Sequence, residues 1–141
     1  ELFQPLWRDR YRLALPQGHP LSLREQVRLI DLEGLAFINR QPCNTLERLK
    51  GLLEKRGISF VSRANIRTLE YALGLVSAGV GAALVPDWES TLAREDIVLR
   101  PFADIELEQQ IGLAYPARAE ITPALLAAIE LCQLRWQTHR S

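Results

Sequence analysis

The sequence predicts an α/β protein in which helices flank a mostly parallel sheet. Short apolar runs, typical of buried strands, alternate along the chain with segments of helical periodicity, and the connections between them are short. The chain has 141 residues, of which 48% are apolar, enough for one packed core. These observations favour one domain, or most of one, in which strands and helices alternate.

The first expected elements are two strands separated by a loop. Residues 11–16 (YRLALP) alternate and end in proline, which suits a strand that leaves a sheet. Residues 17–22 (QGHPLS) have the composition of a loop, and residues 27–35 are expected to form a short turn of helix and a connector. Residues 35–39 (LAFIN) form a short apolar run, so we expect a buried strand there.

A helix is expected next, over residues 45–56. Either Asn44 or Thr45 can act as its N-cap, and with Asn44 in that place Glu47 completes a capping box. Gly57 is the natural residue to end the helix, since glycine readily adopts the left-handed conformation found there. One face of this helix is apolar at the spacing of successive turns, through Leu46, Leu49, Leu52 and Leu53.

The second half of the alternating pattern follows directly. Residues 58–64 (ISFVSRA) alternate and predict a strand. Thr68 is a plausible N-cap for a helix over 69–78, which Gly79 would end. Residues 81–86 (GAALVP) predict a small buried strand that stops at proline.

The remaining segments predict simpler elements. Residues 87–95 begin as a short helix, and residues 97–102 and 108–115 are expected strands. Residues 122–137 are expected to form a helix with Thr122 as its N-cap.

Composition excludes several classes of function. Seventeen basic residues balance seventeen acidic ones, so no overall attraction to nucleic acid or membrane is visible, and no apolar run is long enough to span a bilayer. The two cysteines, Cys43 and Cys132, and the two histidines, His19 and His139, are isolated in sequence. We therefore predict no metal, no cofactor and no catalytic residues, in a reduced, cytoplasmic setting.

Polar residues follow three of the predicted strands, at 39–45, 64–68 and 85–87. Ligands in parallel α/β sheets bind beyond the carboxyl ends of the strands, and two of these ends run straight into helix N-termini, which favour anions. An arginine there can hold an acidic ligand through two hydrogen bonds, although loop arginines are most often solvated. The predicted ligand-binding residues are Asn39, Arg40, Asn44, Thr45, Asn65, Arg67, Thr68 and Val85. For Asn44 and Thr45, helix capping alone is the simpler role.

Cys43 stands just before a predicted helix start, where a thiol can be activated. It is therefore a candidate redox switch. The alternative is a partly buried thiol that packs beside the ligand site. We favour that alternative, because free cysteines are commonly buried and inert and Cys132 is distant in sequence.

Three segments in order carry a family resemblance. They are LWRDRYRLALPQGHPLS (6–22), IDLEGLAFI (30–38) and TLEYALGLVSAGVGAALVP (68–86). With their His-Pro-Leu, Asp-Leu-Glu-Gly and small-residue-rich Gly-x-Gly pieces, they resemble the effector-binding domain of LysR-type transcriptional regulators. The resemblance extends over roughly residues 3–137.

The resemblance implies a periplasmic-binding-protein-like (type II) fold with two lobes and a small effector in the cleft between them. On this basis residues 11–88 are the second lobe, and residues 1–10 and 97–141, with the C-terminal helix, are a remnant of an incomplete first lobe. The loop that matches 44–45 lines the effector cleft in the family. Such regulators assemble as homodimers or homotetramers and bind DNA through a winged helix-turn-helix domain that is absent from this sequence.

An incomplete first lobe would leave apolar side chains without their usual cover, on Ile111, Leu113 and the helix at 122–137. We expect another chain or altered packing to bury them. Two other functions remain open: a solute-binding protein of a transport system, which shares the fold, and a redox sensor that uses Cys43. An enzyme would need a convergent set of catalytic groups, and the sequence shows none.

Overall fold

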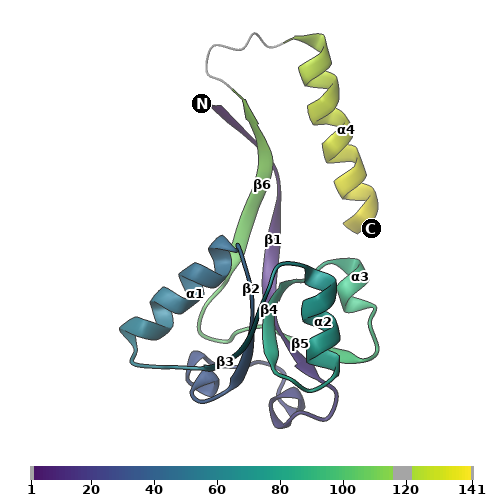
Figure 1. Ribbon diagram of the computed structural model, residues 1–141. Helices are drawn as coiled ribbons and strands as arrows, with labels where there is room; N and C mark the ends of the chain where they lie inside the picture. Colours follow the sequence, from purple (N-terminus) through teal and green to yellow (C-terminus); the bar gives the residue numbers. More distant parts are fainter. Residues whose placement is uncertain (1, 116–121, 141) are drawn as a thin grey trace. The chain divides into compact units, whose positions relative to one another are not determined.

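The computed structural model describes residues 2–115 and 122–140, which fall into two compact units (Figure 1). The larger unit is Arg10–Glu108, and the smaller one combines Glu1–Asp9 with Gln109–Ser141. The larger unit therefore extends past the predicted lobe boundary at residue 88. Residues 1, 116–121 and 141, which belong to the predicted first-lobe remnant, lie outside the described residues.

A mixed sheet forms the centre of the larger unit. Its strand order is β3-β2-β4-β1-β5, with β1 at Leu2–Pro16, β2 at Ala36–Arg40, β3 at Val61–Ile66, β4 at Ala82–Pro86 and β5 at Ile97–Arg100. β2 pairs in parallel with β3 and with β4, whereas β1 is antiparallel to both β4 and β5. The mostly parallel sheet is thus confirmed, with β1 as the strand that runs the other way. Because β5 pairs with β1, residues 97–100 belong to this unit.

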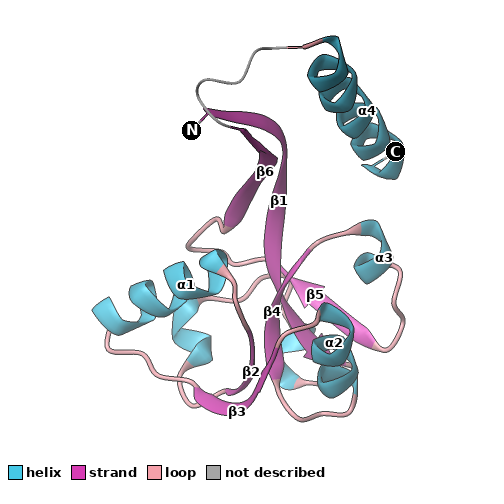
Figure 2. Ribbon diagram, turned by 45° about the horizontal axis from the view of Figure 1, so that its top comes forward, coloured by secondary structure: helices cyan, strands magenta, loops and turns pink. Residues whose placement is uncertain are grey.

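The two longer helices of this unit lie on opposite faces of the sheet, as both ribbon views show (Figures 1 and 2). α1 (Asn44–Lys55) connects β2 to β3, and α2 (Leu69–Ser77) returns the chain across β2 to β4. Right-handed crossovers that run in opposite directions place their helices on opposite faces. The carboxyl end of β2 is therefore the point where the chain order reverses, and ligands bind at such points.

Each face of the sheet has its own hydrophobic core. Neighbouring residues of β2 point to opposite sides, so Phe37 packs with α1 and Ile38 with α2. On the α1 side the cluster includes Leu13, Leu15, Leu46, Leu49, Leu53 and Leu84. On the α2 side it includes Ala14, Ala72, Leu73, Val76, Ala83 and Val85.

The predicted glycine stops are confirmed for both helices. Gly57 and Gly79 have φ of 68° and 80°, a conformation that costs glycine little. After α1, the N–H of Ile58 donates to the carbonyl of Leu53 at 2.9 Å, and the N–H of Gly57 donates to that of Glu54 at 3.1 Å. The same pair of bonds closes α2. Helical carbonyls that would lack partners are thereby satisfied.

The strand predicted at 58–64 is displaced, since β3 runs from Val61 to Ile66. The N–H of Ile58 is used to end α1, and the N–H of Ser59 donates to the Glu33 carboxylate at 2.8 Å. These residues therefore cannot pair with β2. The alternation in the sequence reflects burial of Ile58 and packing of Phe60 on the core.

Three short helices complete the larger unit: η1 (Pro20–Leu23), η2 (Leu29–Leu32) and α3 (Glu89–Leu92). η2 is the short turn of helix expected, together with a connector, within residues 27–35. α3 confirms the short helix expected after residue 87. His19 is the N-cap of η1, and its Nδ1 accepts a hydrogen bond from the N–H of Leu21 at 3.1 Å.

We expect the free energy of unfolding to decrease as the pH falls, because of the titration of His19. Burial lowers the pKa of His19 below 6.5, so the folded protein takes up a proton less readily than the unfolded chain. The contribution of His19 to the free energy of unfolding is complete above pH 6.5. It is lost as the pH falls through the pKa of His19 in the folded protein. In His19→Asn the amide oxygen can cap without titrating. We expect the urea midpoint to fall less between pH 7.5 and 5.5 in this variant than in the wild type.

The comparison between these two proteins cancels the contribution of His139, which both contain. Equal changes of the urea midpoint would show that His19 titrates alike in the folded and unfolded states.

In the smaller unit, β6 (Glu108–Tyr115) pairs with β1. Gly112 lies against the backbone of this neighbour, since a Cβ added there would collide with the carbonyl of Gln4 and the ring of Phe3. Only glycine permits so close an approach without a shift of the strands. The strand predicted at 108–115 is confirmed.

The last helix, α4 (Pro123–Arg140), also belongs to the smaller unit. Thr122 is its N-cap as predicted, and its Oγ1 accepts from the N–H of Leu125 at 3.2 Å. Leu126, Leu131 and Leu134 are 50%, 58% and 62% exposed. This agrees with the expected apolar surface of the helix, whereas Ile111 and Leu113 are half-buried. No helix within residues 2–115 and 122–140 is long and apolar enough to cross a bilayer.

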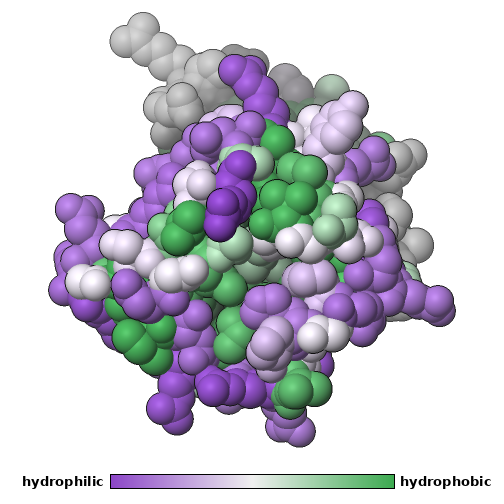
Figure 3. Space-filling view, turned by 60° about the horizontal axis from the view of Figure 1, so that its bottom comes forward, coloured by the Kyte–Doolittle hydropathy of each residue, from purple (hydrophilic) through white to green (hydrophobic). Residues whose placement is uncertain are grey.

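The larger unit also has exposed apolar side chains, and Figure 3 shows such side chains gathered near the middle of one face, among polar ones. Leu23, Ile30, Val61 and Val80 are at least one third exposed. Val61 begins β3 and Val80 precedes β4, so both lie toward the amino ends of these strands.

Candidate functional site

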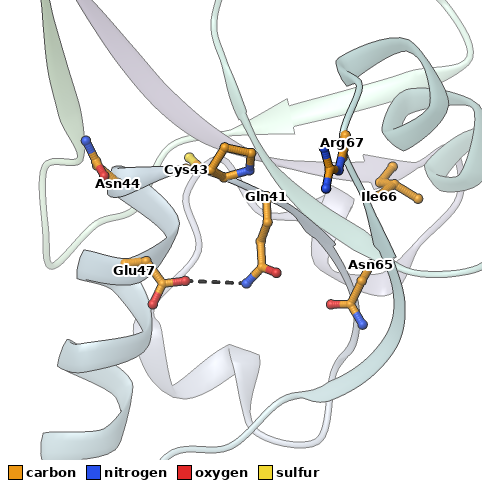
Figure 4. Close-up of a pocket in the computed structure, with 8 residues that line it drawn as sticks. Gln41, Cys43, Asn44, Glu47, Asn65, Ile66 and Arg67 are labelled. Carbon is orange, nitrogen blue, oxygen red and sulfur yellow. Dashed lines mark hydrogen bonds between the residues drawn. The ribbon is translucent and has the colours of Figure 1, made fainter.

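A pocket of about 600 Å³ opens in the larger unit beside the carboxyl ends of β2 and β3. Its volume is in the range typical of small-molecule sites. Three segments form it: the loop after β2, the first turn of α1, and the last residues of β3 with the residue that follows. The lining residues are Gln41, Pro42, Cys43, Asn44, Glu47, Asn65, Ile66 and Arg67 (Figure 4).

Strand pairing brings these segments together. Asn39 and Arg40 of β2 pair with Asn65 and Ile66 of β3. The N–H of Gln41 then donates to the carbonyl of Ile66 at 2.8 Å, which extends the pairing by one residue. The loop after β2 therefore begins directly beside the end of β3, although the two are about 25 residues apart in the chain.

Cys43 is the N-cap of α1, so the expectation that Asn44 or Thr45 is the cap is wrong. Cys43 has the extended backbone required of a cap, with φ −154° and ψ 112°, and its Sγ accepts from the N–H of Leu46 at 3.4 Å. Asn44 is the first helical residue, which moves Glu47 to the fourth and removes the expected capping box. A thiol is a weak acceptor, so the extended backbone of Cys43 is what identifies it as the cap.

The first turn of α1 offers one backbone hydrogen-bond donor in the pocket lining, the N–H of Asn44, whereas Thr45 beside it is buried. The N–H of Leu46 is capped by Cys43, and the N–H of Glu47 donates to the carbonyl of Cys43. Within the described part of the chain, the N–H groups of Asn44 and Thr45 have no acceptor. Such groups at a helix N-terminus can bind an anion.

The pocket contains two opposite charges that are not paired with each other. Glu47 Oε1 accepts from Gln41 Nε2 at 3.4 Å and lies 3.8 Å from Lys50 Nζ. Arg67 is exposed and makes no ion pair with the described acidic residues. Its guanidinium, with five N–H donors, is therefore available to a ligand.

Of the residues predicted to bind a ligand, Asn44, Asn65 and Arg67 line the pocket together with Cys43. Five others do not line it. Asn39, Thr45 and Val85 are buried, Arg40 is half-buried, and Thr68 is exposed, where its Oγ1 accepts from the N–H of Tyr71 at 3.4 Å as the N-cap of α2.

Asn39 is 3% exposed, and its Nδ2 donates to Ser62 Oγ at 2.6 Å. Its Oδ1 is buried without a partner among the described residues. Asn39 therefore lies in the sheet beside Asn65, which is the residue of this pair that reaches the pocket.

Four lining residues were missed: Gln41, Pro42, Glu47 and Ile66. Glu47 lies three residues after Asn44, on the same face of α1, so helical periodicity could have revealed it. Gln41 and Ile66 come into the pocket through the backbone bond between them. No pattern within either segment indicates that bond.

The described residues contain no group of three or more His, Cys, Asp or Glu side chains that could hold a metal ion. Cys43 and Cys132 are both half-buried free thiols. The side chains that line the pocket can recognise a ligand by hydrogen bonds and charge.

Comparison with known protein families shows which family the chain belongs to. Residues 2–137 match the model of the LysR substrate binding domain. The chain belongs to this family. The resemblance seen in the three sequence segments is thereby confirmed.

A curated relative of this LysR substrate-binding domain is the HTH-type transcriptional regulator AlsR of Bacillus subtilis (strain 168). It is 31% identical over 106 residues, which cover 73% of the chain and 35% of the relative. The chain thus spans about one third of the length of that regulator.

Solved structures show the same fold. The regulatory domain of CcmR from Synechocystis PCC6803, in complex with 2-PG, has a TM-score of 0.81 and 14% identity, covering 95% of this chain and 66% of that one. The effector binding domain of QuiR, in complex with shikimate, has a TM-score of 0.79 and 21% identity, covering 98% and 66%. HinK from Pseudomonas aeruginosa has a TM-score of 0.80 and 21% identity, covering 95% and 48%. The expected type II periplasmic-binding-protein-like fold is confirmed.

Proposed function

We propose that this LysR substrate-binding domain senses a small metabolite with a negatively charged group, and that the metabolite binds in the pocket lined by Gln41–Asn44, Glu47 and Asn65–Arg67. The observation that carries the proposal is the position of the pocket at the carboxyl end of β2, where the chain order reverses. The unpaired guanidinium of Arg67 and the N–H group of Asn44 supply donors for the negative group.

The comparisons support a small ligand. Two proteins of the same fold were solved in complex with 2-PG and with shikimate. A transport protein of similar fold is less well supported, because the curated relative at 31% identity is a transcriptional regulator. Catalysis has no support in the pocket, where the described side chains form no set of nucleophile, base and orienting group.

The proposed mechanism is linkage between two equilibria. A metabolite that binds one conformation of the regulator more tightly than another shifts the population toward that conformation. In a homodimer or homotetramer, such a shift changes how the DNA-binding domains of the full regulator are presented. We propose that the regulator acts on DNA in the cytoplasm, and that this domain performs no reaction.

Ligand binding should depend on Arg67. A thermal-shift screen of carboxylates and amino acids on the 141-residue chain should give a compound that raises the melting temperature. In Arg67→Ala we expect the affinity for that compound to fall about 10- to 100-fold, because charge-assisted hydrogen bonds to the ligand are lost. Isothermal titration calorimetry measures the change.

Arg63→Ala is the matched control. Arg63 is an exposed arginine of β3, the strand that Arg67 follows, and it does not line the pocket, so its replacement should leave the affinity unchanged. Full retention of binding in Arg67→Ala would place the ligand elsewhere.

A further inference from the structure

We infer that the pocket selects a ligand that carries both an ammonium group and a carboxylate, as an α-amino acid does. Glu47 and Gln41 would receive the ammonium group, and Arg67 the carboxylate. This rests on the proposed ligand-sensing function of the same pocket and names the class of its ligand.

The acceptor side is formed by Glu47 and Gln41. A carboxylate can only accept hydrogen bonds, so the bond of 3.4 Å between Glu47 Oε1 and Gln41 Nε2 directs the amide nitrogen of Gln41 toward Glu47. The amide oxygen of Gln41 then faces away from Glu47 and remains an acceptor. Figure 4 shows the Gln41 side chain extending between Glu47 and Asn65.

Glu47 keeps one oxygen available. Gln41 and Lys50 both approach Oε1, and Oε2 has no partner among the residues that the structure describes. The Glu47 side chain is 62% exposed, so a ligand can reach it. An acidic residue in the first turn also stabilises a helix, and that role requires neither the contact with Gln41 nor the position in the pocket.

The donor side is formed by Arg67 and the start of α1. The guanidinium of Arg67 is exposed and has no described acidic partner within 4 Å. The N–H group of Asn44, which lines the pocket, lacks an acceptor in the same part of the chain. All these donors suit a carboxylate oxygen.

Having both charges in one pocket decides the ligand class. A ligand with a carboxylate alone would pair with Arg67 and bring a second negative charge toward Glu47. A ligand with an amine alone would satisfy Glu47 and leave Arg67 without a partner. A small zwitterion satisfies both, and about 600 Å³ leaves room for a side chain beside the amides of Asn44 and Asn65.

Matched probes test the inference on the 141-residue chain. Calorimetry compares each common L-amino acid with its 2-hydroxy acid analogue, such as L-serine with L-glycerate, which differ only in the ammonium and hydroxyl groups at C2. We expect at least one amino acid to bind about tenfold or more tightly than its analogue. Glu47→Gln should remove this preference, and Arg67→Gln should weaken both members of the pair.

Glu54→Gln is the matched control. Glu54 is exposed on the same helix and lies outside the pocket lining, so this variant should retain the preference. Analogues that bind as tightly as their amino acids, or a Glu47→Gln variant with unchanged selectivity, would overturn the inference and leave the sensing function intact. If no amino acid binds, the inference fails. If a wider metabolite screen also finds no ligand, the proposed function fails as well.

Discussion

Replacing Phe37 with alanine is expected to lower the free energy of unfolding by about 3–5 kcal/mol. Phe37 lies on β2, is fully buried, and packs with the leucines of α1. Its ring stacks on that of Phe60, with centroids 4.3 Å apart and planes at 14°. Truncation removes buried apolar contact and leaves a cavity between the sheet and α1, whose first turn lines the pocket. Urea denaturation followed by circular dichroism measures the loss.

Tyr71→Ala is the control for this variant. Tyr71 is an aromatic residue of α2 that is 73% exposed, so its truncation should change the free energy of unfolding by less than about 0.5 kcal/mol. A loss below about 1.5 kcal/mol for Phe37→Ala would contradict the close packing of the α1 face.

Replacing Gly81 with alanine should lower the free energy of unfolding by about 1–3 kcal/mol. Gly81 precedes β4, where this strand lies against β2. A Cβ at Gly81 would be 2.8 Å from the carbonyl oxygen of Ala36, 2.9 Å from its carbonyl carbon and 3.1 Å from the nitrogen of Phe37. All three are backbone atoms of a central strand, so they cannot move aside without disturbing the pairing of Phe37 with Ala82.

The same substitution in a helix should have the opposite sign. Gly51 is an exposed residue within α1, and an added Cβ there meets nothing within 4 Å. Gly51→Ala should raise the free energy of unfolding by about 0.5–1 kcal/mol, because alanine loses less backbone entropy in a helix. Chemical denaturation of both variants gives the comparison. A neutral Gly81→Ala would mean that β4 and β2 do not approach as closely as described.

Much of the fold could be predicted from short segments. The apolar spacing in α1, the glycine ends at Gly57 and Gly79, and the Thr68 and Thr122 caps depend on residues within one or two helical turns. The predicted strand bounds were wrong where a backbone N–H group bonds to a residue outside the expected strand pair. At residues 58–59 the N–H groups bond to Leu53 and Glu33, so alternation did not produce a strand there.

The candidate site was predicted in part. The rule that ligands bind at the carboxyl ends of parallel strands selected Asn44, Asn65 and Arg67, and these three residues line one pocket. It also included Val85, which lies in the core between β4 and α2 because its side chain points to the α2 face. Glu47 was treated as a capping residue, whereas it lies in the pocket lining, one helical turn after Asn44.

Local sequence was thus sufficient for the element types, the helix ends and the family. The antiparallel place of β1 within the sheet, the register of Asn39 with Asn65, and the meeting of Gln41, Glu47 and Arg67 around one pocket depended on the packed chain. The physical reason is the separation in sequence of the residues that interact. Helical spacing and caps involve neighbours in sequence, whereas strand order and register arise from hydrogen bonds and side-chain burial between segments tens of residues apart.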